Sequence, residues 1–141
     1  TLQPVEHRLQ ILPGAGGVTV IDDSYNANPV GVHNALAVLQ SFDGALKILV
    51  TPGLVELGAV EEAENHRYGL HAATVCDHVI VMEAKPAAAL RAGLRDGGMA
   101  EDRIHAAASL EDATGLIGRL TRPGAVVLFA NDLPDTYLGD L

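Results

Sequence analysis

The sequence predicts an α/β domain built on a mostly parallel sheet of about six strands, with one antiparallel strand and helices on both faces. Two observations support this fold class. Short runs rich in β-branched residues alternate along the 141-residue chain with longer stretches that have helical spacing. Each short run is almost continuously apolar, as in strands that are buried on both faces of a sheet. Repeated strand–helix alternation is typical of parallel sheets with right-handed crossovers.

The first expected strand, Arg8–Leu12, is joined to the next run by Pro13-Gly14-Ala15-Gly16-Gly17. This short glycine-rich link is typical of a hairpin and predicts the antiparallel strand. It does not resemble a phosphate-binding loop, because it precedes a strand and no Lys-Ser/Thr follows it. The other expected strands are the apolar runs Val18–Ile21, Lys47–Val50, His78–Met82, Arg103–Ala106 and Ala125–Phe129.

The helix starts are marked by capping residues and prolines. Asn28-Pro29 and Lys85-Pro86 place a proline at a first turn, and Ser109 precedes two acidic residues. These are typical N-terminal signals of helices. Residues 1–141 are therefore expected to form one Rossmann-like, three-layer domain. The expected helices are Val30–Phe42, Glu61–Val75, Pro86–Arg95 and Leu110–Leu120.

The composition argues against several classes of partner. Eighteen acidic residues against nine Lys and Arg give a formal net charge of −9. Too few cations remain for a basic patch, so neither nucleic acid nor an anionic membrane surface is an expected partner. No apolar run approaches the roughly 18 residues that span a bilayer. The single cysteine, Cys76, excludes an internal disulfide and is interpreted as a small buried hydrophobe in a cytoplasmic protein.

The most informative segment is Asp22-Asp23-Ser24-Tyr25-Asn26-Ala27-Asn28-Pro29, which follows an expected strand and opens an expected helix. In open α/β sheets, ligands bind at the carboxyl ends of strands, beside helix N-termini. Carboxylates there can accept hydrogen bonds from ribose hydroxyls, and amides can orient a phosphate. A structural interpretation stays open, in which Asn28 caps the helix and Asp22 or Asp23 forms an Asx turn.

This eight-residue segment resembles a motif in the third domain of the Mur ligases, closest to the branch that joins D-alanyl-D-alanine to a UDP-muramoyl tripeptide. The resemblance extends from about residue 4 to residue 129. Three further features occur in the same order as in that family: His7-Arg8-Leu9, Val55-Glu56-Leu57-Gly58 and Glu64-Asn65-His66-Arg67-Tyr68-Gly69.

The resemblance implies an ATP-dependent reaction in which an amine attacks an acyl phosphate and forms an amide. It implies ATP and Mg²⁺ as cofactors, both held mainly by a central ATPase domain of the same polypeptide. The third domain closes over that domain, and the implied substrates are a UDP-muramoyl peptide and D-alanyl-D-alanine. No Gly-Lys-Ser/Thr occurs in the chain. The chain is therefore expected to be one domain of a longer enzyme, and to be inactive alone.

The nucleotide contacts implied by the resemblance are Arg8, Asp23, Asn26 and Asn28, with Asp22 as the alternative to Asp23. An arginine suits phosphate oxygens because its planar donors bind oxygen pairs and never deprotonate.

The implied substrate contacts are Tyr25, Glu56 and His66. A turn-capping role stays open for Glu56, and a helix-packing role for His66. No metal site is expected in this domain, because the six histidines lie on different expected elements without zinc spacing.

The sequence departs from the family pattern at two places. Thr51-Pro52-Gly53 stands where that branch usually has Gly-Asp-Met. After the last strand, Asn131 and Asp132 begin an acidic loop where the branch has a basic one. These two residues are predicted substrate contacts, with a simple C-terminal turn as the alternative. An acidic rim favours a free amine over a carboxylate. A different amine and acid pair, or a non-catalytic binding module, stays open as an alternative function.

Overall fold

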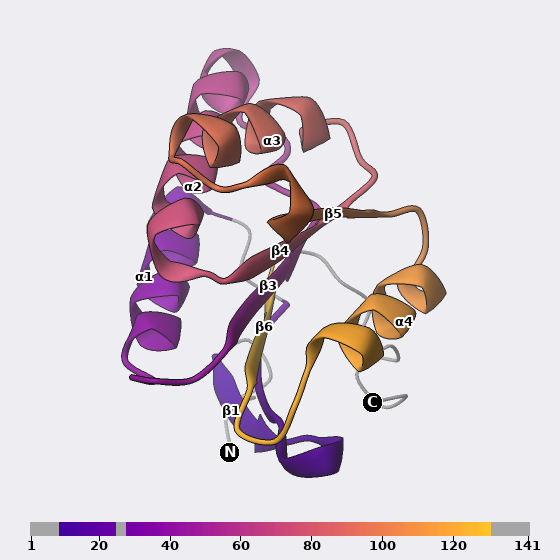
Figure 1. Ribbon diagram of the computed structural model, residues 1–141. Coiled ribbons are helices and arrows are strands. Elements are labelled where there is room, and N and C mark those ends of the chain that lie inside the picture. The colour runs from indigo at the N-terminus through magenta and orange to yellow at the C-terminus, as the bar shows by residue number, and fades with distance from the viewer. Residues whose placement is uncertain (1–8, 25–27, 131–141) are drawn as a thin grey trace, which may run out of the picture.

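A computed structural model describes residues 9–24 and 28–130 and confirms the predicted fold class. The sheet has the order β1-β2-β6-β3-β4-β5 (Figure 1). β1 is antiparallel to β2, as the glycine-rich link predicted, and the other strand pairs are parallel. The strands are β1 (Gln10–Pro13), β2 (Thr19–Asp23), β3 (Lys47–Thr51), β4 (His78–Met82), β5 (Ile104–Ala107) and β6 (Val126–Ala130).

Three layers form because the helices divide between the two faces of the sheet (Figure 1). One apolar core lies between the sheet and helices α1 (Pro29–Gln40), α2 (Glu61–Val75) and α3 (Ala87–Asp96). A second, smaller core lies between the other face and helix α4 (Leu110–Leu120). Within the described ranges, no helix has the length and apolarity needed to cross a membrane.

The predicted helix starts are confirmed to within one residue. The Oδ1 of Asn28 accepts a hydrogen bond from the Gly31 backbone N–H at 2.8 Å, with Pro29 as the first helical residue. The Oγ of Ser109 caps α4 in the same way, at 3.1 Å from the N of Asp112. Pro86 precedes α3 instead of beginning it.

The expected end of the second strand at Ile21 is wrong by two residues. Parallel pairing with β6 continues through Asp22, opposite Phe129, and Asp23, opposite Ala130. Both aspartates are therefore held in the sheet, and the connection to α1 begins only at Ser24.

Helices α2 and α3 pack with their backbones in contact. A Cβ added at Gly93 would lie 2.1 Å from the carbonyl oxygen of His66, and one at Gly69 would lie 2.4 Å from that of Leu90. Real Cβ atoms do not approach so closely, so only glycine fits these two positions. Nothing in the sequence analysis predicted this contact.

Four histidines form two pairs, which the sequence analysis also did not predict. His33 of α1 and His71 of α2 stack, and their Nδ1 atoms are 2.7 Å apart. The Nδ1 of His78 on β4 lies 3.1 Å from the Nε2 of His105 on β5. The pKa of each of these imidazoles is lowered, chiefly because burial disfavours the charged form.

The histidine pairs predict that acid destabilises the domain. A lowered folded-state pKa means that the unfolded chain binds more protons below about pH 6.5, so stability is lost as the pH falls through that region. Protonated His33 would carry an N–H on both ring nitrogens, and its Nε2 is buried with no hydrogen-bond partner in the described part of the chain. We expect the melting temperature to fall between pH 7.5 and pH 5.5, and to fall less when His33 and His105 are both replaced by glutamine. The same slope in both proteins would contradict this prediction.

Candidate functional site

The five parallel strands end along one side of the sheet, which we call the carboxyl edge. β2, β6 and β3 are neighbours there, with Asp23 opposite Ala130 and Val50 opposite Phe129. The ends of β2 and β3 are thus two strand spacings apart, about 10 Å. The β2–α1 and β3–α2 connections both leave this edge (Figure 1), so the motif segment and the Glu56 loop lie at the same end of the sheet.

The two aspartates of the motif point to opposite faces of the sheet, because side chains alternate along a strand. The Oδ1 of Asp22 accepts hydrogen bonds from the N and Oγ of Ser24, at 3.1 and 2.7 Å. This is the Asx-type turn that the sequence left open, and it is made by Asp22. Asp23 is buried and lies on the side of Ile21, which packs beneath α1, α2 and α3.

Asn28 lies at the far end of the same connection and caps α1. It therefore fills the structural role that the sequence allowed, and it keeps the start of α1 at the carboxyl edge. The predicted contacts Arg8, Tyr25, Asn26, Asn131 and Asp132 lie outside the described residues.

Glu56 is exposed at the tip of the β3–α2 loop and has a φ of +64°, which makes it the only residue other than glycine with a positive φ in the described ranges. The loop is hydrogen-bonded below this tip. Asn65, which is fully buried, binds the N and the O of Leu54, each at 2.8 Å. The Oε1 of Glu61 accepts from the N of Leu57 at 3.4 Å.

The sequence analysis did not single out Asn65. Its signal was helical spacing, because it shares the buried face of α2 with Tyr68, Gly69 and Ala72. An amide on such a face must find partners inside the protein.

His66, the neighbour of Asn65, is not brought to the candidate site. Its Nε2 lies 2.7 Å from the Oδ2 of Asp96, the last residue of α3, and both side chains are partly exposed. The helix-packing interpretation therefore describes the contact that His66 makes.

Comparison with known proteins identifies the family. Residues 7–131 match the model of the Mur ligase, glutamate ligase domain, which is nearly the whole of the 141-residue chain. The chain belongs to the Mur ligase family.

Two curated Mur ligases match this domain in sequence. The UDP-N-acetylmuramoyl-tripeptide–D-alanyl-D-alanine ligase of Bacillus subtilis is 33% identical over 63 residues, which cover 44% of the chain and 14% of that enzyme. The UDP-N-acetylmuramoylalanine–D-glutamate ligase of Rubrobacter xylanophilus is 35% identical over 124 residues, which cover 88% of the chain and 26% of that enzyme. The chain thus spans about a quarter or less of these relatives.

Solved Mur ligases share the fold. A crystal structure of MurF from Acinetobacter baumannii matches with a TM-score of 0.74 and 26% identity, covering 99% of this chain and 30% of that one. MurF from Thermotoga maritima in complex with ADP matches with a TM-score of 0.70 and 23% identity, covering 92% of this chain and 28% of that one.

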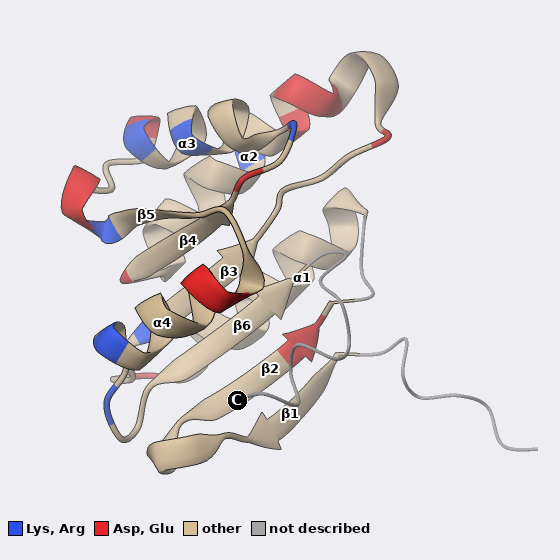
Figure 2. Ribbon diagram, turned by 90° about the vertical axis from the view of Figure 1, so that its right-hand side faces the viewer, with Lys and Arg blue, Asp and Glu red and all other residues tan. Residues whose placement is uncertain are grey.

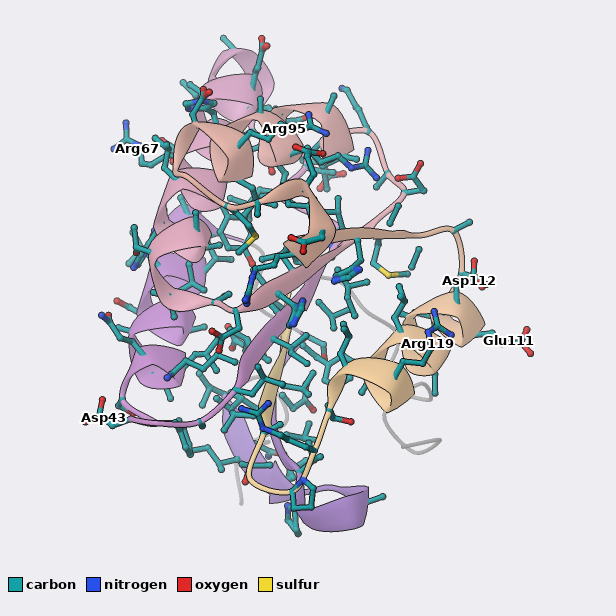
Figure 3. All side chains as sticks on the ribbon, viewed as in Figure 1. Asp43, Arg67, Arg95, Glu111, Asp112 and Arg119 are labelled. Atoms are coloured by element: carbon teal, nitrogen blue, oxygen red, sulfur yellow. The ribbon has the colours of Figure 1, made fainter. Side chains whose placement is uncertain are left out.

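The carboxyl edge of this Mur ligase domain is acidic. Acidic residues, red in Figure 2, lie at the end of β2 and in the first turn of α4, and the first turn of α2 carries three glutamates. Arg95 in the last turn of α3 and Arg119 in that of α4 lie at the opposite helix ends (Figure 3). Lys85, in the β4–α3 connection, lies at the carboxyl edge and pairs with Glu61 at 3.6 Å. This distribution complements the helix dipoles. It also makes the carboxyl edge more attractive to an ammonium group than to a phosphate.

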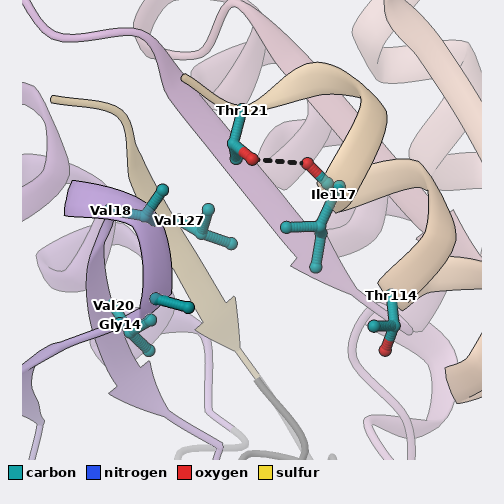
Figure 4. Close-up of a pocket in the computed structure, with 9 residues that line it drawn as sticks. Gly14, Val18, Val20, Thr114, Ile117, Thr121 and Val127 are labelled. Atoms are coloured by element: carbon teal, nitrogen blue, oxygen red, sulfur yellow. Dashed lines mark hydrogen bonds between the residues drawn. The ribbon is translucent and has the colours of Figure 1, made fainter. Parts of the chain in front are cut away.

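A largely apolar hollow of the Mur ligase domain lies elsewhere. It has a volume of about 260 Å³ and lies between α4 and the β1–β2 turn, with Val20, Ile117 and Val127 among its lining residues (Figure 4). None of the described residues that line it has a titratable side chain. Because Val18 and Thr121 place it near the strand starts, it does not belong to the candidate site.

Asp23 offers a carboxylate at the carboxyl edge, where a ribose hydroxyl could donate. The glycine-rich link before β2 lies at the strand starts, away from that edge. In the part of the chain that the structure describes, no three potential metal ligands come together. We therefore assign no Mg²⁺ site to these residues.

Proposed function

We propose that the chain is the C-terminal domain of an ATP-dependent ligase that forms an amide bond in peptidoglycan precursor synthesis. In this proposal a central domain of the same polypeptide makes most of the contacts to ATP and holds the Mg²⁺. The present domain closes over it and brings the amine of D-alanyl-D-alanine to an acyl phosphate on the UDP-muramoyl peptide. The observation that carries the proposal is the motif segment at the carboxyl edge, the end of the sheet from which the Glu56 loop also leaves, in a domain of this family.

The predicted site residues within the described ranges have the following roles in the proposal. Asp23 accepts a hydrogen bond from the ribose, as the resemblance of the motif segment to that of the family implies. Glu56 accepts from the incoming ammonium group. Asn28 holds the start of α1 in place. We leave His66 out of the substrate contacts because its imidazole is bonded to Asp96.

The remaining roles in the proposal concern residues outside the described ranges. Arg8 and Asn26 contact the nucleotide. Tyr25, Asn131 and Asp132 contact the substrates.

A phosphate-release assay tests the reaction class and the substrate together. The full-length enzyme that contains this domain should release phosphate from ATP and Mg²⁺ only when both the UDP-muramoyl tripeptide and D-alanyl-D-alanine are present. The 141-residue chain alone should release none. If the full-length protein releases no phosphate with any amine, the ligase proposal fails and a non-catalytic binding module takes its place.

A second candidate is a ligase that adds D-glutamate, since the Rubrobacter relative of that name matches 88% of the chain. The acidic carboxyl edge argues against this amine, because D-glutamate brings two carboxylates and D-alanyl-D-alanine brings one. The same assay distinguishes them. Phosphate release with UDP-N-acetylmuramoylalanine and D-glutamate, and none with the tripeptide and dipeptide, would favour the second candidate.

A further inference from the structure

We propose that Asn65 is a positioning residue that sets the place of the Glu56 carboxylate at the carboxyl edge. The inference rests on the proposed function, in which Glu56 contacts the incoming amine. It starts from the backbone at Glu56, whose φ of +64° lies in a region that residues with a side chain seldom occupy. Such a conformation persists only where the surrounding structure holds it, and it occurs most often at functional sites.

Asn65 supplies much of that support by binding the backbone of Leu54, which is two residues before Glu56. Its Oδ1 accepts from the N of Leu54 at 2.8 Å, and its Nδ2 donates to the O of Leu54 at 2.8 Å. The same Nδ2 donates to the O of Glu61 at 2.8 Å. One buried amide thus binds both backbone groups of Leu54 and ties the loop to the first turn of α2.

The contacts around Leu54 leave the loop little freedom. Gly53 has a φ of +86°, and a Cβ there would lie 2.8 Å from the Oδ1 of Asn65 and 2.7 Å from the Cγ of Pro86. The Oγ1 of Thr51 accepts from the N of Gly53 at 3.0 Å and from the hydroxyl of Tyr68 at 3.3 Å. Burial raises the pKa of Tyr68 and keeps it a neutral donor.

The base of the loop is buried, whereas its tip is open to solvent. Leu54 is 1% exposed and Asn65 is 0% exposed, whereas Glu56 is exposed. A loop held only for stability would have no need of a carboxylate on a strained residue at its tip. The arrangement instead presents one acidic side chain from a rigid base, at the edge where α1 and α2 begin.

A double-mutant cycle in the full-length ligase tests the inference. Asn65→Ser keeps a hydroxyl that can bond back to the O of Glu61 and gives up both bonds to Leu54. A displacement of about 1 Å in a positioning group can lower turnover about 100-fold, so Asn65→Ser should lower kcat/KM by 10-fold or more, with a rise in KM for the amine and none for ATP. Glu56→Gln should lower kcat/KM similarly, and the double variant should be no worse than Glu56→Gln alone.

The control is Asn34→Ser, on the exposed face of α1, which should leave kcat/KM unchanged. If Asn65→Ser fails to fold, the cycle is run with Gly53→Ala, whose Cβ would meet the Oδ1 of Asn65 and the Cγ of Pro86 and so displace the same loop with the Asn65 amide still present. Losses that multiply in the double variant of an active enzyme would overturn this inference alone. A wild-type enzyme that releases no phosphate with any amine would overturn the proposed function and this inference with it.

Discussion

Replacing Gly93 with alanine is expected to destabilise the domain by about 3 kcal/mol, because overpacking a close contact typically costs 1–3 kcal/mol and here the obstacle is backbone. The added Cβ would lie 2.1 Å from the carbonyl oxygen of His66 and 3.0 Å from the Cα of Gly69. Helices α2 and α3 would have to separate, which would weaken the core beneath them. Thermal unfolding should show a fall in melting temperature of about 10 °C for a domain of this size.

Gly118→Ala is the matched control. Gly118 also lies inside a helix, α4, but a Cβ there meets nothing within 4 Å. Alanine has the higher helix propensity, so this variant should gain about 0.5–1 kcal/mol. The same propensity gain applies at Gly93, so a loss there can be assigned to the contact. A Gly93→Ala protein as stable as the Gly118→Ala protein would show that α2 and α3 do not pack as described.

The sequence predicted most of the fold because the signals for its elements are local. Continuous apolar runs between capped helices indicated the parallel strands, and the glycine-rich link indicated the antiparallel one. Asn28 and Ser109 were identifiable as caps because a cap acts on backbone groups two or three residues away. The strand end at Ile21 was predicted wrongly because pairing with β6, more than 100 residues later, keeps Asp22 and Asp23 extended.

The parts of the site that were missed depend on contacts between distant elements. The side chain of Asn65 binds the backbone of Leu54, which lies 11 residues earlier in the chain. His33 meets His71 across 38 residues. Spacing along the chain cannot show either pair. The residue types of the motif indicated a ligand site, but they did not show which aspartate does what. The structure shows that Asp22 accepts a hydrogen bond from Ser24 and that Asp23 lies on the opposite face of the sheet.

Replacing Asp23 with asparagine in the full-length ligase is expected to lower kcat/KM by about 100-fold. A hydrogen bond to a charged group contributes about 1.5–3 kcal/mol, and each 1.4 kcal/mol is a factor of ten. The loss should appear mainly as a higher KM for ATP, because the proposed partner is the ribose. Asparagine keeps the size of the side chain, so a buried position should tolerate it better than alanine. Steady-state kinetics and a thermal melt of the same sample would check both points.

Asp43→Asn is the control for charge, since Asp43 is exposed in the turn between α1 and β3, at the end of the sheet opposite the carboxyl edge (Figure 3). It should keep full activity. Asp22→Asn completes the comparison, because an asparagine can still accept from Ser24 and preserve the turn. Only a small loss is therefore expected at Asp22. If Asp22→Asn loses activity and Asp23→Asn does not, the nucleotide contact belongs to Asp22. Asp23, which lies on the face covered by α1, then stabilises the fold instead.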